Sequence, residues 1–475
     1  MSSLLTSMTT AGNALDVYQQ ALTVVQNNIT NSTTPGYATQ SLNMVAQPFD
    51  VASGLAGGVA AQGLDSARDE YAEEEVRRQM QSLGKYETQT SGLSSIDNLF
   101  DVTGTSGIPA DLNNLFSSFS AWAASPDSAS AQQMVIANAG NLASDIHSLS
   151  ASLAQVSGDV ESQIGSTVTQ INQLASNIQQ DNVEQLQQGS SDPGIDANLT
   201  SSLEQLSELV DVSVVHQADG TVTVLMDGGS PLVVGTSQYS ISSGQAVPSG
   251  AANAQAPPSA QILDSQGNDI TSQIQGGKLG GLLDVHNNVL ASLVGDGQQA
   301  GSLNQFAKAF ADTVNGILQS GTVSTDSGAA QGAPLFVYDN SDPTAAAGSF
   351  ALNPAITPSQ LAPVDAQGNA NGNANQLASL ANSTSAGGVN GLTFGDFFSG
   401  IASSVGQQSS TASTNQQAQQ QVVTQTQALR DQASGVSLDD QAVLLLQFQK
   451  GYDATAQLLT TLNNIATTTV NMITE

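Results

Sequence analysis

The chain carries, at residues 4 to 29, the stretch that decides its fold: LLTSMTTAGNALDVYQQALTVVQNNI. Its apolar side chains recur at alternating steps of four and three residues, which is the spacing of a coiled-coil seam. The seam consists of Leu4, Met8, Ala11, Leu15, Tyr18, Leu22, Val25 and Ile29. The pattern predicts one long amphipathic helix, and a helix of about 30 residues is about 45 Å long.

A turn is expected to end this helix. Residues 31 to 36 read NSTTPG, in which polar turn formers precede a proline and a glycine. Pro35 disfavours helical backbone at Thr34, and Gly36 permits a turn. We therefore expect an extended segment after Tyr37.

The carboxy-terminal region repeats the same alternation. Its apolar seam consists of Leu445, Phe448, Tyr452, Leu459, Leu462, Ala466 and Ile473, and Thr455 and Thr469 fill two further steps. A narrow seam cannot be buried within its own helix. The two terminal arms are therefore expected to pair with each other, with neighbouring subunits, or with both. Periodicity alone leaves open an ordinary intramolecular bundle.

Composition excludes several classes of partner and site. The 475 residues include 8 Lys and Arg against 40 Asp and Glu, a net charge of -32. Such a charge repels phosphate backbones and anionic lipid, so we expect neither nucleic-acid nor membrane partners. The chain has no cysteine, which excludes disulfides and thiolate metal sites.

The first ten residues contain no basic side chain, and no apolar run approaches the ~20 residues of a membrane span. We expect neither a membrane span nor a cleaved secretion signal. A cytoplasmic protein and one exported without a cleaved signal both remain possible.

The middle of the chain changes its pattern several times. Helical spacing over most of residues 69–209 gives way to alternating apolar residues from Val212, separated by turns at residues 218–220 and 227–229. Residues 242–259 resemble a loop or linker, helical spacing returns at Leu279, and residues 321–391 suggest irregular β structure. The expected fold is mainly α, with paired coiled-coil-like terminal helices, a helical middle domain and a β-rich insertion. The expected segments are an amino-terminal arm (1–65), a helical domain (66–211), an inserted β domain (212–275), a helical return (276–320), an irregular region (321–395) and a carboxy-terminal arm (396–475).

No motif for chemistry stands out. His147, His216 and His286 are isolated, without the spacing of a metal site. Residues 276–281 read GGKLGG, which lacks the spacing of a phosphate-binding loop and favours a tight start to a helix. We expect no catalytic residue, no cofactor and no metal, and thus a protein that is not an enzyme.

Residues 25–37, VQNNITNSTTPGY, resemble the amino-terminal signature of flagellar rod, hook and hook-associated proteins. The signature residues are Asn27, Asn28, Ile29, Asn31, Gly36 and Tyr37. Further stretches at residues 115–127, 277–284 and 435–452 are similar to the hook-associated members that join hook to filament. Two positions depart from the family: Thr39 stands where an arginine is common, and residues 203–208, LEQLSE, replace an acidic and arginine-containing stretch.

The resemblance implies a structural subunit of the extracellular flagellum. It implies export through the flagellar type III apparatus, escorted by a chaperone on the carboxy-terminal helix. It also implies self-association in a ring between the hook subunit and the next junction protein, through terminal arms that order on assembly and bury both seams. The alternatives are another axial protein, either the hook subunit or the second junction protein, and an extracellular acidic glycan hydrolase.

Overall fold

The computed structural model describes residues 2–50, 55–100, 106–188, 192–246, 257–384 and 388–474. The chain forms two compact units. The first unit consists of Met1–Gln81, Ile171–Ser240 and Gln420–Glu475, and the second of Ser82–Gln170 and Ile241–Gln419. The expected fold class is confirmed, because long helices dominate and the sheets are small and antiparallel. The six-segment division stays a prediction.

Three helices contribute residues to both units. They are α2 (Glu70–Asp97), α4 (Ala129–Gln188) and α10 (Phe394–Ser434). The helical spacing expected over most of residues 69–209 is therefore confirmed in α2 and α4.

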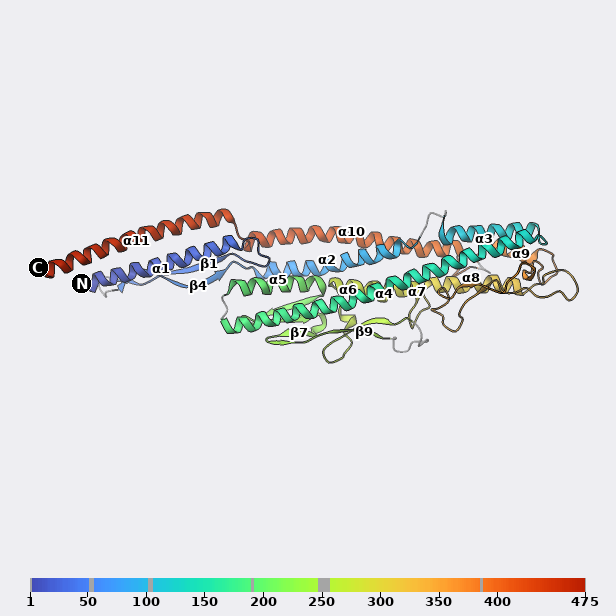
Figure 1. The fold of residues 1–475 in the computed structure, drawn as a ribbon, viewed down its shortest axis with the longest axis horizontal. Coiled ribbons are helices and arrows are strands. Elements are labelled where there is room, and N and C mark those ends of the chain that lie inside the picture. The colour runs from blue at the N-terminus through green and yellow to red at the C-terminus, as the bar shows by residue number, and fades with distance from the viewer. Residues whose placement is uncertain are drawn as a thin grey trace. The chain divides into compact units, whose positions relative to one another are not determined.

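The first unit contains the two arms. Helices α1 (Ser2–Thr30) and α11 (Leu438–Thr474) lie side by side with both chain ends at the same end of the pair, so they run antiparallel (Figure 1). They approach closely at Gly451, where an added Cβ would lie 2.8 Å from Cε1 of Tyr18. The two predicted terminal helices, and their pairing with each other, are thus confirmed.

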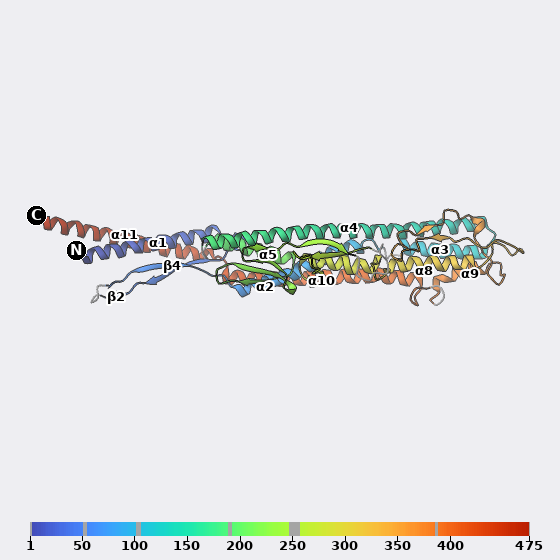
Figure 2. The same ribbon diagram turned by 90° about the horizontal axis from the view of Figure 1, so that it is seen from below.

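A β-hairpin lies along α1 (Figure 2). Strand β1 (Gln40–Ala46) pairs antiparallel with β4 (Val59–Ser66), and the shorter β2 (Phe49–Asp50) pairs with β3 (Leu55–Ala56). The extended segment expected after Tyr37 is confirmed.

The rest of the first unit joins helix ends to a four-stranded sheet. Helix α5 (Pro193–Leu209) begins after Asp192, whose carboxylate accepts hydrogen bonds from the backbone of Gly194 and Ile195. The sheet has the order β5 (Val212–His216), β6 (Val222–Met226), β7 (Pro231–Val234) and β8 (Ser237–Gln238). Asn182 of α4 ties the sheet to the helices, because its side chain bonds both the N–H and the carbonyl of Val222.

The second unit is a helical bundle with two small antiparallel pairs of strands. Its helices α3 (Gly107–Ala124) and α9 (Gly372–Ser379) pack together beside α4. The remaining elements are α6 (Gly277–Asp284), a π-helical turn η3 (Val285–Leu290), α7 (Ala291–Val294), α8 (Ser302–Gln319), β9 (Ser242–Ala246) with β10 (Ser259–Leu263), and β11 (Phe336–Val337) with β12 (Ala351–Leu352).

Aromatic side chains fill the core of the second unit. Phe310 lies at its centre, with ring centroids of Phe394 and Phe336 4.9 and 5.6 Å away. The single tryptophan, Trp122, is fully buried there, and its indole N–H donates to the carbonyl of Pro126 at 3.1 Å. Trp122 fluorescence is therefore a natural reporter of this unit's unfolding.

Two sequence expectations for the second unit need correction. The segment expected as a loop at residues 242–259 begins with strand β9 and ends in β10, while residues 247–256 lie outside the described part. The region expected as irregular β structure contains helix α9, which buries Ala374 and Leu377. In both places small polar residues hid an element that long-range packing stabilises.

The glycine-rich residues 276–281 form a tight start to a helix, as expected. Gly277 has a φ of 66°, and α6 begins there. An added Cβ on Gly281 would lie 2.7 Å from the carbonyl oxygen of Lys85 and 2.9 Å from Cβ of Thr88 on α2. The glycines thus allow two backbones to approach.

This close approach gives a matched pair of substitutions. We expect Gly281→Ala to lower the free energy of unfolding of the second unit by about 1 to 3 kcal/mol, the usual cost of overpacking. Gly316→Ala, in α8, meets no atom within 4 Å and should raise it by about 0.4 to 1 kcal/mol. Urea titration followed by Trp122 fluorescence measures both, and equal midpoints for the two variants would contradict the close packing.

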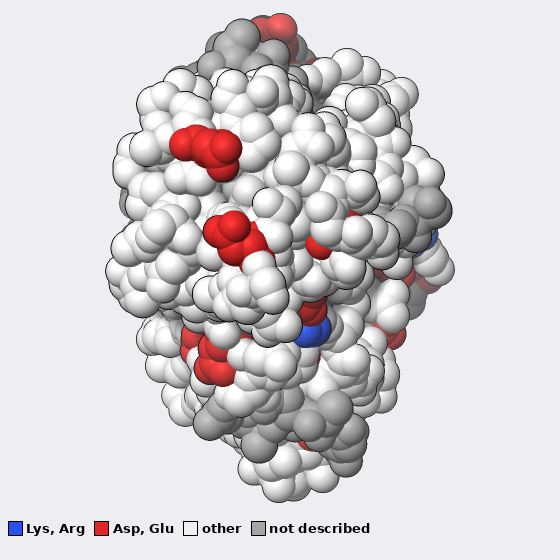
Figure 3. All heavy atoms as spheres, turned by 90° about the vertical axis from the view of Figure 1, so that its right-hand side faces the viewer, with Lys and Arg blue, Asp and Glu red and all other residues white. Residues whose placement is uncertain are grey.

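Carboxyl groups dominate the charge of the chain, although the face in Figure 3 is mostly uncharged. In the second unit, burial raises the pKa of Asp111 to about 6, and Asp145, its hydrogen-bond partner, raises it further. In the first unit, burial and then Glu184 raise the pKa of Asp181 to about 6.

These raised pKa values predict that mild acid stabilises the fold. Between about pH 6 and the ordinary carboxyl pKa near 4, the folded chain holds a proton that the unfolded chain releases, so the free energy of unfolding rises as the pH falls. Groups with a lowered pKa, such as Asp264, oppose this only at lower pH. The urea midpoint reported by Trp122 should be higher at pH 5 than at pH 7, and Asp111→Asn should reduce the difference. A midpoint that falls steadily from pH 7 to pH 5 would count against this account.

Candidate functional site: the paired arms and the junction at their base

The structure covers the predicted seam residues to different degrees. In α1, Ala11 and Val25 are buried, and Leu4, Met8, Leu15, Tyr18, Leu22 and Ile29 are half-buried. In α11, Leu445, Phe448, Tyr452, Leu459, Leu462 and Ala466 are half-buried, as are Thr455 and Thr469. The side chain of Ile473 lies outside the described residues. The role of these residues in assembly stays a prediction.

Helix α11 also carries a second apolar row, which sequence reasoning missed. We call it the outer stripe, and its exposed fractions are 63% for Val443, 58% for Leu446, 53% for Leu458, 49% for Ile465 and 69% for Met472. These residues share one face at helical spacing, away from the seam residues. The α1–α11 pair therefore presents an uncovered apolar surface.

A cluster of buried polar side chains lies at the base of the arms. Nδ2 of Asn28 donates to the carbonyl oxygen of Gln40 at 2.8 Å and to Oε1 of Gln441 at 3.0 Å. Its Oδ1 accepts from the Tyr37 hydroxyl at 2.9 Å and from the Gln40 backbone N–H at 3.0 Å. Burial raises the pKa of Tyr37. This Asn28 cluster joins α1, β1 and α11 through one fully bonded side chain.

The conformation and packing of the turn at residues 31–36 explain why position 36 is a glycine. Gly36 has a φ of 74°, and an added Cβ would lie against the carbonyl oxygen of Ala197 and 2.9 Å from the backbone nitrogen of Ser201, both on α5. A side chain at this position would be both strained and obstructed.

The other signature residues make fewer contacts. Asn31 donates from its side chain to the carbonyl of Asn27 at 3.0 Å, where α1 ends. Ile29 is half-buried, and Asn27 is exposed.

Charged side chains form an ion cluster around this turn, which sequence reasoning also missed. Arg68 donates to the Gly36 carbonyl at 2.7 Å and pairs with Asp196 at 2.7 Å and Glu73 at 2.9 Å. Arg430 pairs with Glu204 and lies 3.6 Å from Glu73.

Arg77 completes the ion cluster. It is buried, which lowers its pKa, while Glu73, Glu74 and Glu204 oppose that shift. Three of the eight basic residues of the chain are thus gathered where residues distant in sequence meet.

Residues at both positions that depart from the family pattern form contacts in the structure. The Thr39 hydroxyl donates to the Gly435 carbonyl at 2.8 Å, and its backbone N–H donates to the Ser434 carbonyl at 2.9 Å. Glu204, in the replaced stretch, pairs with Arg430. The turn between α10 and α11 is therefore fastened to the signature segment.

A groove of about 680 Å³ runs between α1 and the β-hairpin. Helix α1 contributes Asp16, Gln19, Gln20, Thr23, Val24 and Asn27, and the hairpin contributes Leu42, Ala61, Gly63 and Leu64. We call it the arm groove. Its apolar side chains are half-buried, and its polar side chains from α1 are exposed.

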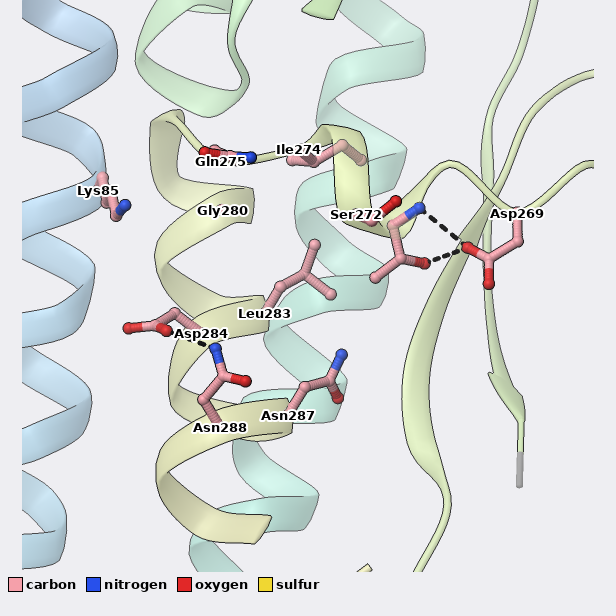
Figure 4. Close-up of a pocket in the computed structure, with 11 residues that line it drawn as sticks. Lys85, Asp269, Ser272, Ile274, Gln275, Gly280, Leu283, Asp284, Asn287 and Asn288 are labelled. Atoms are coloured by element: carbon pink, nitrogen blue, oxygen red, sulfur yellow. Dashed lines mark hydrogen bonds between the residues drawn. The ribbon is translucent and has the colours of Figure 1, made fainter. Parts of the chain in front are cut away.

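A second hollow, of about 570 Å³, lies in the second unit and is drawn in Figure 4. Its carboxylates are engaged within the fold: Asp284 accepts from Gln89 at 2.6 Å and Asn288 at 2.7 Å, and Asp269 accepts from the Thr271 backbone at 2.9 Å. Lys85 lies on α2 across from Asp284. The hollow thus contains no carboxylate pair free for acid–base chemistry.

The three histidines have different surroundings. His147 bonds the Gly348 carbonyl at 2.7 Å, His286 lies between Ser157 and Asn287, and His216 is exposed on β5. Among the described residues, no three His, Asp or Glu side chains form a group that could hold a metal ion. No described helix combines the length and hydropathy that a membrane span needs.

Comparison with known proteins places this architecture in a family. Residues 93–336 match the helical domain of the flagellar hook-associated protein FlgK. The chain is 25% identical to flagellar hook-associated protein 1 of Bacillus subtilis, over 99% of each chain. It is 26% identical to that of Salmonella typhimurium, over 99% of this chain and 100% of the other.

The fold also resembles a solved structure. The flagellar hook junction protein FlgK from Burkholderia pseudomallei aligns with a TM-score of 0.63 at 19% identity, covering 75% of this chain and 99% of that one. Because the matched family model covers more than half of the 475 residues, the chain belongs to the family of flagellar hook-associated proteins FlgK.

Proposed function

We propose that this chain forms the junction between hook and filament in the bacterial flagellum and assembles through its terminal helices. The observation that carries the proposal is the family match over residues 93–336, together with likeness over 99% of the chain to proteins named flagellar hook-associated protein 1. The chain is accordingly a structural component of the extracellular flagellum and not an enzyme. The alternatives of a glycan hydrolase, a hook subunit and a second junction protein are set aside by family membership.

The arms supply the contacts for assembly. The outer stripe of α11 exposes five large apolar side chains. Because each is already partly covered, its full burial gains only part of the about 1.5 to 3 kcal/mol that a fully exposed side chain would gain. Neighbouring subunits would cover this surface and stabilise the half-buried seam beneath it. We expect ordering of the arms to be coupled to assembly.

The partners are flagellar assembly proteins. Among them we propose copies of this chain in a ring, the hook subunit on one side and the next junction protein on the other. We also propose that a flagellar export chaperone covers α11 before assembly, because an exposed apolar stripe would otherwise promote aggregation. Export would follow the flagellar type III route.

A deletion strain tests the junction role. Without the gene, cells should keep their hooks, lack filaments and release flagellin into the medium. The intact gene should restore filaments, and a chain that stops at residue 437, before α11, should not. Filaments of normal number in the deletion strain would refute the proposal.

A further inference from the structure

Each of the two terminal helices contains one charged residue that is the only one of its kind in that helix. Lys450 is the only basic residue of α11, and Asp16 is the only charged residue of α1. Both side chains are exposed. Within the described residues, neither forms an ion pair within 4 Å or a hydrogen bond, although the acidic Asp453 follows Lys450 by three positions. Both charges are therefore free to pair across a contact with another molecule.

Lys450 lies within the outer stripe. It follows Val443 and Leu446 by seven and four positions and precedes Leu458 by eight, spacings that return to the same helix face. A cation thus lies in the middle of an exposed apolar row. A surface that covers this row must also accommodate its positive charge.

Asp16 lies at one end of the arm groove. The groove offers apolar side chains from Val24, Leu42 and Leu64, and no residue of α11 lines it. Its α1 side extends from Asp16 to Asn27, which is about 16 Å of helix. That length accommodates about three turns of a second helix beside a single carboxylate.

We infer that the part of the outer stripe around Lys450 lies in the arm groove of the next copy, with Lys450 paired to Asp16 across the contact. The inference rests on the proposed function, because it concerns how subunits of the ring meet. The two surfaces are complementary in charge and both are apolar, whereas either surface facing its own counterpart would oppose like charges. Contacts between two different surfaces of one chain propagate head to tail, which is how closed rings form.

Charge exchange tests the pairing in cells. Lys450→Asp and Asp16→Lys should each reduce the number of filaments per cell by about tenfold or more, since each places like charges together at a desolvated contact. The double variant restores opposite charges and should recover filaments. Because hook and other junction proteins stay unchanged, recovery is expected only when the two positions meet. A double variant as defective as either single one, or single variants with normal filaments, would overturn the inference.

Crosslinking separates copies from other partners, because the chain has no cysteine of its own. Asp16→Cys combined with Lys450→Cys, treated in isolated flagella with a short bis-maleimide, should give a ladder of multimers of this chain on denaturing gels. Each single cysteine variant should give none. Bands that join the chain to another protein, or a chain linked only within itself, would overturn the inference. In those cases a deletion strain that lacks filaments would still support the junction role.

Discussion

Replacement of Asn28 by leucine should leave cells with hooks but without filaments. The leucine is similar in size but removes four hydrogen bonds, and it leaves the N–H and carbonyl of Gln40, Oε1 of Gln441 and the Tyr37 hydroxyl without their partner. Each buried polar group left unpaired costs about 1 to 3 kcal/mol, so the base of the arms loses several kcal/mol in every subunit.

The second unit should not sense this change, because all members of the Asn28 cluster belong to the first unit. Urea unfolding reported by Trp122 is therefore expected to match that of the unsubstituted chain. Asn13→Leu is the control, since Asn13 is an exposed position of the same helix. Filaments retained in the Asn28→Leu strain would show that the cluster does not organise the arms.

Leu459→Asp is expected to separate assembly from folding. Leu459 is a half-buried seam residue in the middle of α11. A carboxylate there must be desolvated or protonated once neighbours close over the arms, at a cost of several kcal/mol per subunit. Part of the about 1.5 to 3 kcal/mol from burial of the leucine is lost as well.

Because Leu459 belongs to the first unit, we expect unchanged urea unfolding of the second unit, reported by Trp122, together with loss of filaments and release of flagellin into the medium. Thr460→Asp places the same charge on the adjacent exposed residue and should keep filaments attached. A large fall in the urea midpoint reported by Trp122 would instead show that the substitution disrupts folding beyond the arms.

Local patterns were sufficient for the long elements of the fold. The four-and-three spacing from Leu4 to Ile29 predicts α1, and the alternation from Val212 predicts strands β5 and β6. Local patterns were insufficient for elements built from small polar residues. Strand β9 reads SSGQA and is held by its register with β10, so no apolar alternation marks it. The start of α5 is likewise not marked by apolar spacing, although Asp192 before Pro193 is a capping signal for it.

The residues of the site, too, could be predicted from local patterns only in part. Asn28 belongs to the signature, but its partner Gln441 is 413 residues away, and no local spacing connects them. The ion cluster likewise joins residues 68, 196 and 430, which only the folded chain brings together. The outer stripe was present in the spacing of Val443, Leu446, Leu458, Ile465 and Met472. It went unrecognised because the seam already accounted for the amphipathic character of the helix.

The location of the chain on the flagellum tests the account most directly. Antibody against the second unit, detected with gold particles on intact flagella, should label one narrow band where the hook meets the filament. Flagella from the Leu459→Asp strain should lack that band. Labelling distributed along the whole hook or along the filament, or no labelling of intact flagella that carry filaments, would contradict the assignment of this chain to the junction.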